Sequence, residues 1–393
     1  MNFVSPAVSP VWLDSKSCSL DHFRAQVERR TSTTDVPWAA EIIANIPVYD
    51  APNIRRVSND PDAVRDVTAE WHRVFLSGAG IVILRKTYED PTLIDRVTEI
   101  LGRLIAEEHQ SNGGKGDHFA AAGSNSRLWN AHEKLCLADP EVFALYNANP
   151  IVPLVSRSWL GPHYQITTQV NVVHPGGKAQ TCHRDYHLGF QTMDELAGYP
   201  AHVHWLSSAL TLQGAIAHTD MALETGPTKL LPFSQTYQPG YFAAQLPEFR
   251  AYFEQNFVQA PLAKGDTLFF NPAVFHAAGD NTTKDVHRFA NLMQIGSGYG
   301  RSIEIVDRGR MSHHIYPTLV AMQEKLSAQE LEDVIAACAE GYAFPANLDI
   351  DSPLGGMAPE SQQGLLRRAL KEGWETAKFH TALTAQQDRK RSH

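Results

Sequence analysis

The chain has 393 residues, of which 43% are hydrophobic and 20% are charged, enough to bury a core in one large domain or in two. Its formal net charge of -9 argues against a nucleic-acid-binding protein, and it has no apolar run of about 18 residues that would span a membrane. The four cysteines form no CxxC pair and the N-terminus shows no secretory signal, so we expect a cytoplasmic protein without a disulfide framework.

The N-terminal part of the chain predicts an irregular arm followed by a helix, a strand and a second helix. Residues 1–58 are rich in Pro, Ser and Thr and show little periodicity, which is typical of irregular structure. An Asp-Pro pair then opens a helix over 60–75, where apolar side chains recur at helical spacing. The apolar run 81–84 predicts a buried strand, and a second Asp-Pro pair opens a helix over 90–104.

The middle of the chain predicts short β-strands separated by turns. Between residues 164 and 295, runs rich in β-branched and aromatic residues alternate with turns that contain Gly, Pro or Asp. The predicted strands are 166–173, 180–186, 205–217 (as one or two strands), 267–275 and 288–295. Many short strands at this spacing favour a β-sandwich or barrel over a parallel sheet. We therefore expect a mainly β core with helical flanks.

The C-terminal part of the chain predicts helices again. Ser327 and Glu330 form a capping box ahead of an apolar helical pattern that ends before Gly341, and a further helix is expected over about 361–378. We expect this region to close the active site as a lid, or to serve as an oligomer contact or a buttress for the core. The whole chain thus divides into an N-terminal arm (1–58), a central domain (59–300) and a helical C-terminal extension (301–393).

One set of residues in the predicted strands has the spacing of a metal site. His183 and Asp185 stand two apart, so on a strand their side chains point the same way, and His276 ends a later predicted strand. Two histidines and one carboxylate are the usual ligands of oxygen-activating iron(II), and they leave the opposite face of the metal open. Arg288 begins the next strand, where its guanidinium could hold the far carboxylate of a dicarboxylate cosubstrate with two hydrogen bonds.

Each of these residues also has an ordinary structural explanation. His183 and Asp185 could form a hydrogen-bonded pair on a half-exposed strand, while His276 could be a core histidine and Arg288 a partner in a surface salt bridge. A lone His-x-Asp triplet is a weak signal, and a second one occurs at 218–220. The stronger signal is the combination of strand context, a late histidine and an arginine on the following strand.

Four stretches of sequence around these residues form a recognisable set. They are CHRDYH at 182–187, DMALETGPTKLLPFSQ at 220–235, KGDTLFFNPAVFH at 264–276 and NTTKDVHRFANLMQIG at 281–296. Together they resemble the phytanoyl-CoA dioxygenase family of iron(II)/2-oxoglutarate oxygenases, over about residues 60–300. The resemblance implies a double-stranded β-helix (jelly-roll) core. It also implies iron(II) ligation by His183, Asp185 and His276 and 2-oxoglutarate binding by Arg288, with O2 as the second cosubstrate.

The resemblance has one departure and resolves one ambiguity. It places Asp220 in the strand before the Gly226-Pro227 turn, so the second His-x-Asp triplet is not expected to bind metal. The family often has Gly-Ser-His after the proline that follows this turn, whereas here Pro232 is followed by Phe233-Ser234-Gln235. Because that strip approaches the substrate side, the resemblance does not carry the substrate class over to this chain.

Several other side chains are candidates for the walls of the pocket. Gln169 and Asn171 share one face of the strand before the His-x-Asp segment, and Trp205 lies on a later predicted strand. We expect these three to contact the cosubstrate, with ordinary barrel packing as the alternative for each. His187 is expected to line the pocket without ligating the metal, because a fourth ligand would occupy an open position. The pair His202-Val-His204 has no carboxylate at suitable spacing and is expected to be structural.

The combined prediction is an Fe(II)/2-oxoglutarate-dependent dioxygenase. It would hydroxylate an unactivated C–H bond of a small organic substrate while 2-oxoglutarate is decarboxylated to succinate and CO2. Related halogenases lack the carboxylate that Asp185 provides here, which favours hydroxylation, desaturation or ring closure. Two other classes stay open, a zinc-dependent jelly-roll isomerase or hydrolase and a non-catalytic small-molecule-binding module. We expect no nucleic-acid or membrane partner, and the sequence leaves the substrate and the oligomeric state open.

Overall fold

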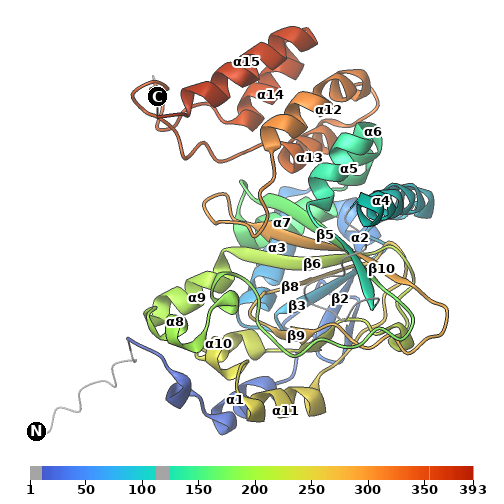
Figure 1. Cartoon of the computed structure of the whole chain (residues 1–393), viewed down its shortest axis with the longest axis vertical. Coiled ribbons are helices and arrows are strands. Elements are labelled where there is room, and N and C mark those ends of the chain that lie inside the picture. The colour runs from blue at the N-terminus through green and yellow to red at the C-terminus, as the bar shows by residue number, and fades with distance from the viewer. Residues whose placement is uncertain (1–10, 112–123, 354, 393) are drawn as a thin grey trace, which may run out of the picture.

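The computed structural model describes residues 11–111, 124–353 and 355–392 and shows a mixed α/β protein (Figure 1). Its centre is an eight-stranded sheet with the order β1-β2-β3-β8-β6-β10-β5-β4, and β7 pairs separately with β9. The strands are β1 (Glu41–Ile43), β2 (Ile46–Asp50), β3 (Ile81–Arg85), β4 (Asn125–Leu128), β5 (Gln165–Val173), β6 (Thr211–Ala217), β7 (Lys229–Leu231), β8 (Thr267–Phe270), β9 (Phe275–Ala277) and β10 (Arg288–Gly296).

Helices occupy more of the described chain than strands do, so the prediction of a mainly β protein is wrong. The physical reason is that the apolar outer face of the sheet is covered by helices rather than left to water. The helices are α1 (Leu20–Val27), α2 (Ala51–Val57), α3 (Pro61–Leu76), α4 (Pro91–Ser111), α5 (Ala131–Ala138), α6 (Pro140–Asn147), α7 (Ile151–Leu160), α8 (Met193–Ala197), α9 (Ala201–Ala209), α10 (Gly240–Ala243), α11 (Pro247–Asn256), α12 (Arg308–Met322), α13 (Ala328–Cys338), α14 (Gln362–Lys371) and α15 (Thr376–Arg389).

The two faces of the main sheet bury two different apolar clusters. Phe289 and Met293 of β10, with Ile216 of β6, belong to a large cluster that the sheet shares with the helices. Ala290 of β10 and Leu268 of β8 belong to a second, smaller cluster. Because successive side chains of a strand point to opposite faces, β10 contributes to both clusters. The second face is therefore an interior, and it is the face toward which Arg288, Ala290 and Leu292 of β10 point.

The N-terminal arm is more regular than its composition predicts. Between residues 11 and 58 the chain forms α1, β1, β2 and α2, and β2 joins the main sheet in parallel with β3. Residues 46–49 of β2 are buried, so the strand is stabilised by tertiary packing that composition alone does not register. The first ten residues of the predicted arm, and with them the absence of a secretory signal, lie outside the described residues.

The predicted helix–strand–helix segment is confirmed as α3, β3 and α4. The side chain of Asp60 accepts hydrogen bonds from the backbone N–H groups of Asp62 and Ala63, and Pro61 is the first residue of α3. These local interactions satisfy the free N–H groups of the first turn, which explains why sequence alone places the helix start correctly.

Three predicted strands differ in the structure. Residues 180–186 are extended but form only one isolated antiparallel bridge, between His183 and His276. The predicted strand 205–217 begins inside helix α9, and only its second part is strand β6. The predicted strand 267–275 ends at Phe270, because a turn containing Pro272 interrupts the ladder before β9. In each case a turn or a tertiary contact overrides a pattern that suits a strand.

The C-terminal helices pack away from the edge of the sheet that carries β1 and β2. Figure 1 shows α12 to α15 grouped beyond α5 and α6, and α12 contacts both of these helices. The capping box of Ser327 and Glu330 is present at the start of α13, as predicted. The single helix predicted over 361–378 is instead two helices, α14 and α15, because Gly373 at φ +61° turns the chain between them. The division into three parts, and the lid role, stay predictions.

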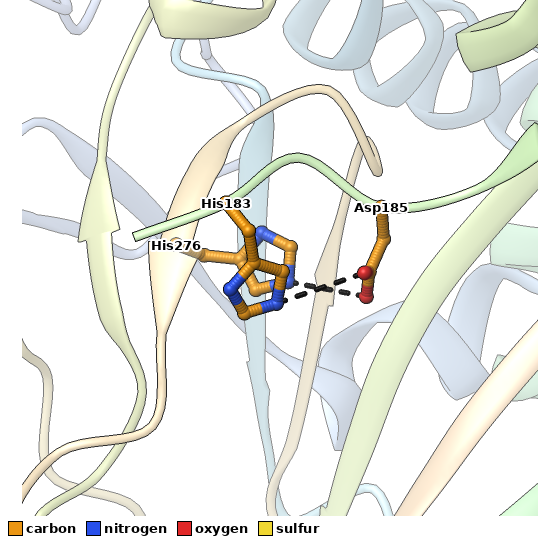
Figure 2. A group of neighbouring side chains, drawn as sticks. All are labelled: His183, Asp185 and His276. Carbon is orange, nitrogen blue, oxygen red and sulfur yellow. Dashed lines mark ion pairs between the residues drawn. The ribbon is translucent and has the colours of Figure 1, made fainter. Parts of the chain in front are cut away.

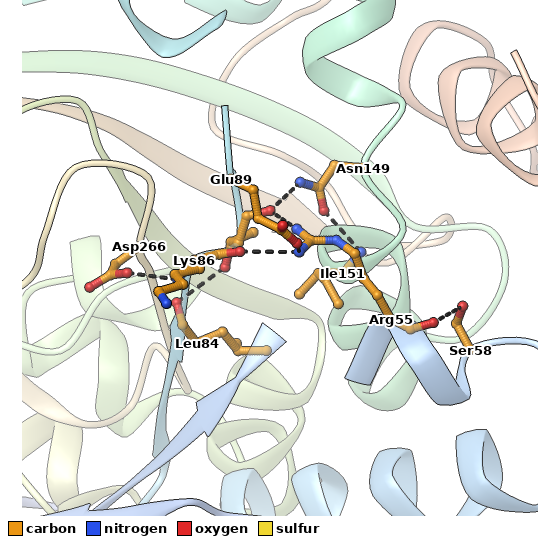
Figure 3. Close-up of polar contacts among 9 residues, drawn as sticks. Arg55, Ser58, Leu84, Lys86, Glu89, Asn149, Ile151 and Asp266 are labelled. Carbon is orange, nitrogen blue, oxygen red and sulfur yellow. Dashed lines mark hydrogen bonds and ion pairs between the residues drawn. The ribbon is translucent and has the colours of Figure 1, made fainter. Parts of the chain in front are cut away.

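A polar network holds the end of β3 in place (Figure 3). Arg55 of α2 donates to the backbone carbonyls of Lys86 (3.2 Å) and Thr87 and pairs with Glu89. Asp266 accepts a hydrogen bond from the backbone N–H of Lys86 (2.8 Å). Since Asp266 immediately precedes β8, these bonds fix β3 against β8, and both strands form part of the interior.

In the described ranges, no helix has the length and apolar character needed to cross a membrane.

Candidate active site

His183, Asp185 and His276 lie together in the structure (Figure 2). His183 and Asp185 come from the extended segment 180–186, and His276 comes from β9. The backbone N–H of each histidine donates to the carbonyl of the other (3.0 and 3.1 Å), which brings the two ring centroids within 4.4 Å. Nε2 of His183 is 3.6 Å from Oδ1 of Asp185, and Nε2 of His276 is 3.4 Å from Oδ2. In the described ranges, these three residues are the group of His, Cys, Asp or Glu side chains that lie close enough together to hold one metal ion.

The backbone also sets the orientation of both imidazole rings. Nδ1 of His183 lies 2.8 Å from the carbonyl oxygen of Thr181, and Nδ1 of His276 lies 2.8 Å from that of Val274. A carbonyl oxygen can only accept, so Nδ1 carries the proton in both rings and Nε2 keeps its lone pair. Both lone pairs face the carboxylate of Asp185, which is the arrangement that a two-histidine, one-carboxylate metal centre needs.

Asp185 is held as a carboxylate by its surroundings. Burial raises the pKa of Asp185, but the imidazoles of His276 and His183 and the amide of Gln213 hold it well below its ordinary value. Nε2 of Gln213 donates to Oδ2 of Asp185 at 2.6 Å and lies 3.1 Å from Oε1 of Gln294. Burial, with the like charge of His276, lowers the pKa of His183 and so favours its neutral form. A carboxylate at Asp185 and a neutral imidazole at His183 are the protonation states that bind a divalent cation.

Arg288 lies at the start of β10 and is buried, with 6% of its surface exposed. Its Nη1 is 3.5 Å from the carbonyl oxygen of Thr225, and burial lowers its pKa to about 10. Within the part of the chain that the structure describes, Arg288 forms no ion pair with a carboxylate. The alternative interpretation of Arg288, a partner in a surface salt bridge, therefore does not apply to these residues. Arg288 lines a cavity together with Asn171 and Leu230, and Leu230 is the β-sheet partner of His276. The cavity that Arg288 lines thus reaches Leu230, the residue that pairs with His276 of the triad.

A comparison of the sequence with family models decides the family. The model described as phytanoyl-CoA dioxygenase (PhyH) matches residues 53–290, which is more than half of the chain. The chain belongs to the phytanoyl-CoA dioxygenase family. It is therefore an enzyme of a non-haem iron, 2-oxoglutarate-dependent family, and the triad is the candidate set of side chains for holding the iron.

Individual relatives are more distant. The dioxygenase trt7 of Aspergillus terreus (strain NIH 2624 / FGSC A1156) is 27% identical over 144 residues, which are 37% of this chain and 44% of that protein. The chain thus spans less than half the length of this curated relative. Among solved structures, the epimerase SnoN in complex with Fe3+, alpha ketoglutarate and nogalamycin RO gives a TM-score of 0.43 at 17% identity, over 61% of this chain and 85% of SnoN. The carbocyclase SnoK gives a TM-score of 0.42 at 18% identity, over 60% of this chain and 86% of SnoK.

The additional pocket residues predicted for this dioxygenase-family chain fall into two groups. Gln169 and Asn171 are buried on the interior face of β5, as the strand pattern predicts, and Asn171 lines the same cavity as Arg288. Trp205 is not brought to the triad. It lies on helix α9, is 58% exposed and borders a different cleft, so the prediction that it lines the iron pocket is wrong. The error follows from the helix at 201–209, which replaces the predicted strand.

The remaining histidines do not join the triad. Nε2 of His187 donates to the carbonyl oxygen of Arg301 at 3.0 Å, and the backbone of His187 has φ +44°. His204 is buried and hydrogen-bonded to the carbonyl of Leu196 (3.1 Å), while His202 is exposed on the same helix. Residues two apart on a helix do not share a face, so His202 and His204 cannot act as a metal pair.

Two buried polar residues, Gln213 and Glu304, are not singled out by the sequence, and Gln213 contacts Asp185. Gln213 was placed in a predicted strand, but nothing in its sequence neighbourhood shows that it meets Asp185. Glu304 follows β10, is buried, and accepts a hydrogen bond from the backbone N–H of Asn130. Burial raises the pKa of Glu304 to about 7, and the hydrogen bond from the backbone N–H of Asn130 opposes this rise.

Proposed function

We propose that this enzyme oxidises a C–H bond of a small organic molecule, with hydroxylation as the simplest outcome, using iron(II), 2-oxoglutarate and O2. The observation that carries the proposal is the triad with both Nδ1 atoms bonded to backbone carbonyls, next to a buried arginine that has no carboxylate partner in the described chain. Bound iron, 2-oxoglutarate and O2 supply the oxidising chemistry. The chain supplies ligation, orientation and an interior that excludes water.

Each residue of the site has a separate task in this proposal. His183, Asp185 and His276 hold the metal on one face, and Gln213 keeps the carboxylate of Asp185 in place. Arg288 receives the carboxylate of 2-oxoglutarate that lies far from the metal, because its guanidinium is buried and otherwise uncompensated. A zinc-dependent hydrolase or isomerase would have no use for this buried cation.

We also propose that the core is a double-stranded β-helix. Support comes from the antiparallel group β5-β10-β6-β8 on one side and from β7-β9, extended by the His183–His276 bridge, on the other. The ligands would then sit where the two layers meet. The names of the similar proteins SnoN and SnoK describe epimerisation and carbocyclisation, so hydroxylation is one of several outcomes that this kind of centre supports. The four cysteines are free thiols, in keeping with the proposal of a reducing, cytoplasmic location.

The test is binding of iron(II) and 2-oxoglutarate under anaerobic conditions, followed by the visible charge-transfer band of the chelated complex. We expect the band with the wild-type protein and with the control variant His202→Ala, and its loss with His276→Ala. Succinate formation from 2-oxoglutarate in air, screened against candidate organic substrates, then identifies the substrate class. Activity that depends on zinc and is indifferent to 2-oxoglutarate would instead support the hydrolase or isomerase.

A further inference from the structure

A second cleft, of about 670 Å³, lies behind the segments that carry the triad. Its walls come from α1, the end of α3, α7, α9 and the chain around Tyr237, and none of the triad residues lines it. Its size is in the range of pockets that hold small organic ligands. Trp205 of α9 is one of the residues that line the cleft.

The cleft is cationic although the protein as a whole is acidic, with a net charge of -9. Arg29 and Arg184 line it, and no Asp or Glu does. Neither arginine forms an ion pair with a carboxylate in the described ranges, and the hydrogen bonds that the structure shows for their guanidinium groups go to backbone carbonyls and one hydroxyl. A local excess of two guanidinium groups without acidic partners favours an anion.

Both arginines are held in fixed positions. Arg29 donates to the carbonyl of Gln26 (2.8 Å), the carbonyl of Ser77 (3.3 Å) and the hydroxyl of Thr236 (3.0 Å). Arg184 is buried, and its Nη2 donates to the carbonyls of Ser234 and Tyr237. These neutral acceptors orient the guanidinium groups without neutralising them, so a ligand would meet pre-organised positive charge.

The other walls suit a flat ring. Trp205 is 58% exposed at the cleft, and Trp159 and Tyr237 also line it. The indole N–H of Trp159 donates to the carbonyl of Thr211 (3.0 Å), which fixes the plane of that ring. An exposed tryptophan in the same cleft as two arginines without a carboxylate partner in the described ranges is the composition expected of a site that binds an aromatic anion.

We propose that this cleft is a second binding site, distinct from the iron site, for a small organic anion that carries a flat ring. Arg184 stands between His183 and Asp185 in the sequence, and the backbone N–H of Asp185 donates to Pro272, whose neighbours Asn271 and Ala273 line the cleft. A ligand in the cleft would therefore meet Arg184 and the turn that leads into β9, while none of the triad residues lines the cleft.

The experiment is a fluorescence titration of the iron(II)-loaded protein, kept anaerobic and saturated with 2-oxoglutarate, with 1-anilinonaphthalene-8-sulfonate as the probe. N-phenyl-1-naphthylamine, which has the same rings without the sulfonate, is the neutral control. We expect single-site binding of the anionic probe that saturating 2-oxoglutarate does not displace. Arg29→Gln should weaken it about tenfold, which corresponds to about 1.4 kcal/mol, and Trp205→Ala should weaken both probes.

Two further variants control for charge and for folding. Arg65→Gln removes an exposed arginine from the far part of α3 and should leave binding unchanged. Arg29→Lys keeps the charge and should retain most of the affinity, which separates recognition of the anion from damage to the fold. The proposal is overturned if Arg29→Gln and Trp205→Ala bind the anionic probe like the wild type, if the neutral probe binds equally well, or if 2-oxoglutarate displaces the probe.

Discussion

The chain contains two His-x-Asp triplets, and their His and Asp side chains face each other in one triplet but not in the other. In the first, His183 and Asp185 face each other across 3.6 Å, and each has further polar partners around a shared centre. In the second, His218 is buried against the helices, while Asp220 is exposed and accepts a hydrogen bond from the backbone N–H of Lys264 (2.8 Å). The same spacing thus produces a convergent pair in one place and a divergent pair in the other.

The difference lies in what each histidine does with its two nitrogens. Nδ1 of His218 is 2.8 Å from the hydroxyl of Thr98, which itself donates to a backbone carbonyl, and Nε2 is 2.8 Å from the hydroxyl of Tyr146. Both nitrogens are therefore occupied, and no lone pair is left for a metal. His183 uses only Nδ1 for the backbone and keeps Nε2. A free, directed lone pair distinguishes a candidate ligand from a structural histidine.

The largest expected effect tests this comparison directly. Asp185→Ala should abolish iron(II) binding and turnover, because a facial ligand is lost, whereas Asp220→Ala should retain both. Iron titration and succinate formation measured on the two variants provide the check. Loss of iron from the Asp220 variant alone would assign the metal to the second triplet.

Arg288→Ala should raise the Michaelis constant for 2-oxoglutarate at least tenfold while iron affinity changes little. Removing one partner of a buried, hydrogen-bonded charge pair costs about 2–5 kcal/mol, and about 1.4 kcal/mol is tenfold. Arg288→Lys should recover only part of the loss, because an ammonium group lacks the two-pronged geometry. Steady-state kinetics at varied 2-oxoglutarate and saturating iron measures this. An unchanged Michaelis constant in a folded Arg288→Ala protein would remove Arg288 from the site.

His218 should affect acid stability, not metal binding. Burial lowers the pKa of His218 from 6.5 to about 3. Between these two pH values the imidazole of His218 is therefore neutral in the folded protein, whereas the same imidazole takes up a proton in the unfolded chain. The contribution of His218 to stability is thus fully present above pH 6.5 and is lost as the pH falls toward 3. We expect His218→Gln to reduce the pH dependence of the free energy of unfolding by at most about 1.4 kcal/mol per pH unit in that window.

Chemical denaturation at several pH values measures this slope, with iron affinity measured in parallel. His132, whose pKa burial also lowers to about 3, contributes equally in both proteins, so the difference isolates His218. An identical slope in the variant, or a loss of iron at neutral pH, would contradict the structural role of His218.

The smallest expected effect concerns Gln213, which touches the first triplet and has no counterpart at the second. Gln213→Leu should weaken iron(II) binding about tenfold, since residues that orient metal ligands typically contribute 10–100-fold. Gln213→Glu is the matched control, because it keeps the shape but places a second carboxylate 2.6 Å from Asp185, in the position of the donor amide. Equal iron affinity in all three proteins would show that Asp185 needs no such support.

The sequence by itself determined the local structure where short-range signals suffice. The Asp-Pro start and helical periodicity predicted α3, the capping box predicted α13, alternation predicted β5, and the turn at 279–281 predicted the strand β10 that follows it. It also singled out the triad and Arg288, because strand spacing and the family resemblance agreed on them. The caps, the helical periodicity and the alternation act within a few residues, so they do not depend on how the chain packs, whereas the triad and Arg288 were joined across the chain by the family resemblance.

Only the tertiary structure decided which of these side chains meet. Trp205 lines another cleft, not the predicted iron pocket, because tertiary packing favours helix α9 over a strand at this position. Gln213 contacts Asp185 although the two residues are 28 positions apart in the chain. The two His-x-Asp triplets could not be told apart by spacing, since the partners of His218 lie on α4 and α6. Contacts between residues far apart in sequence arise from the packing of whole elements, and no local pattern encodes them.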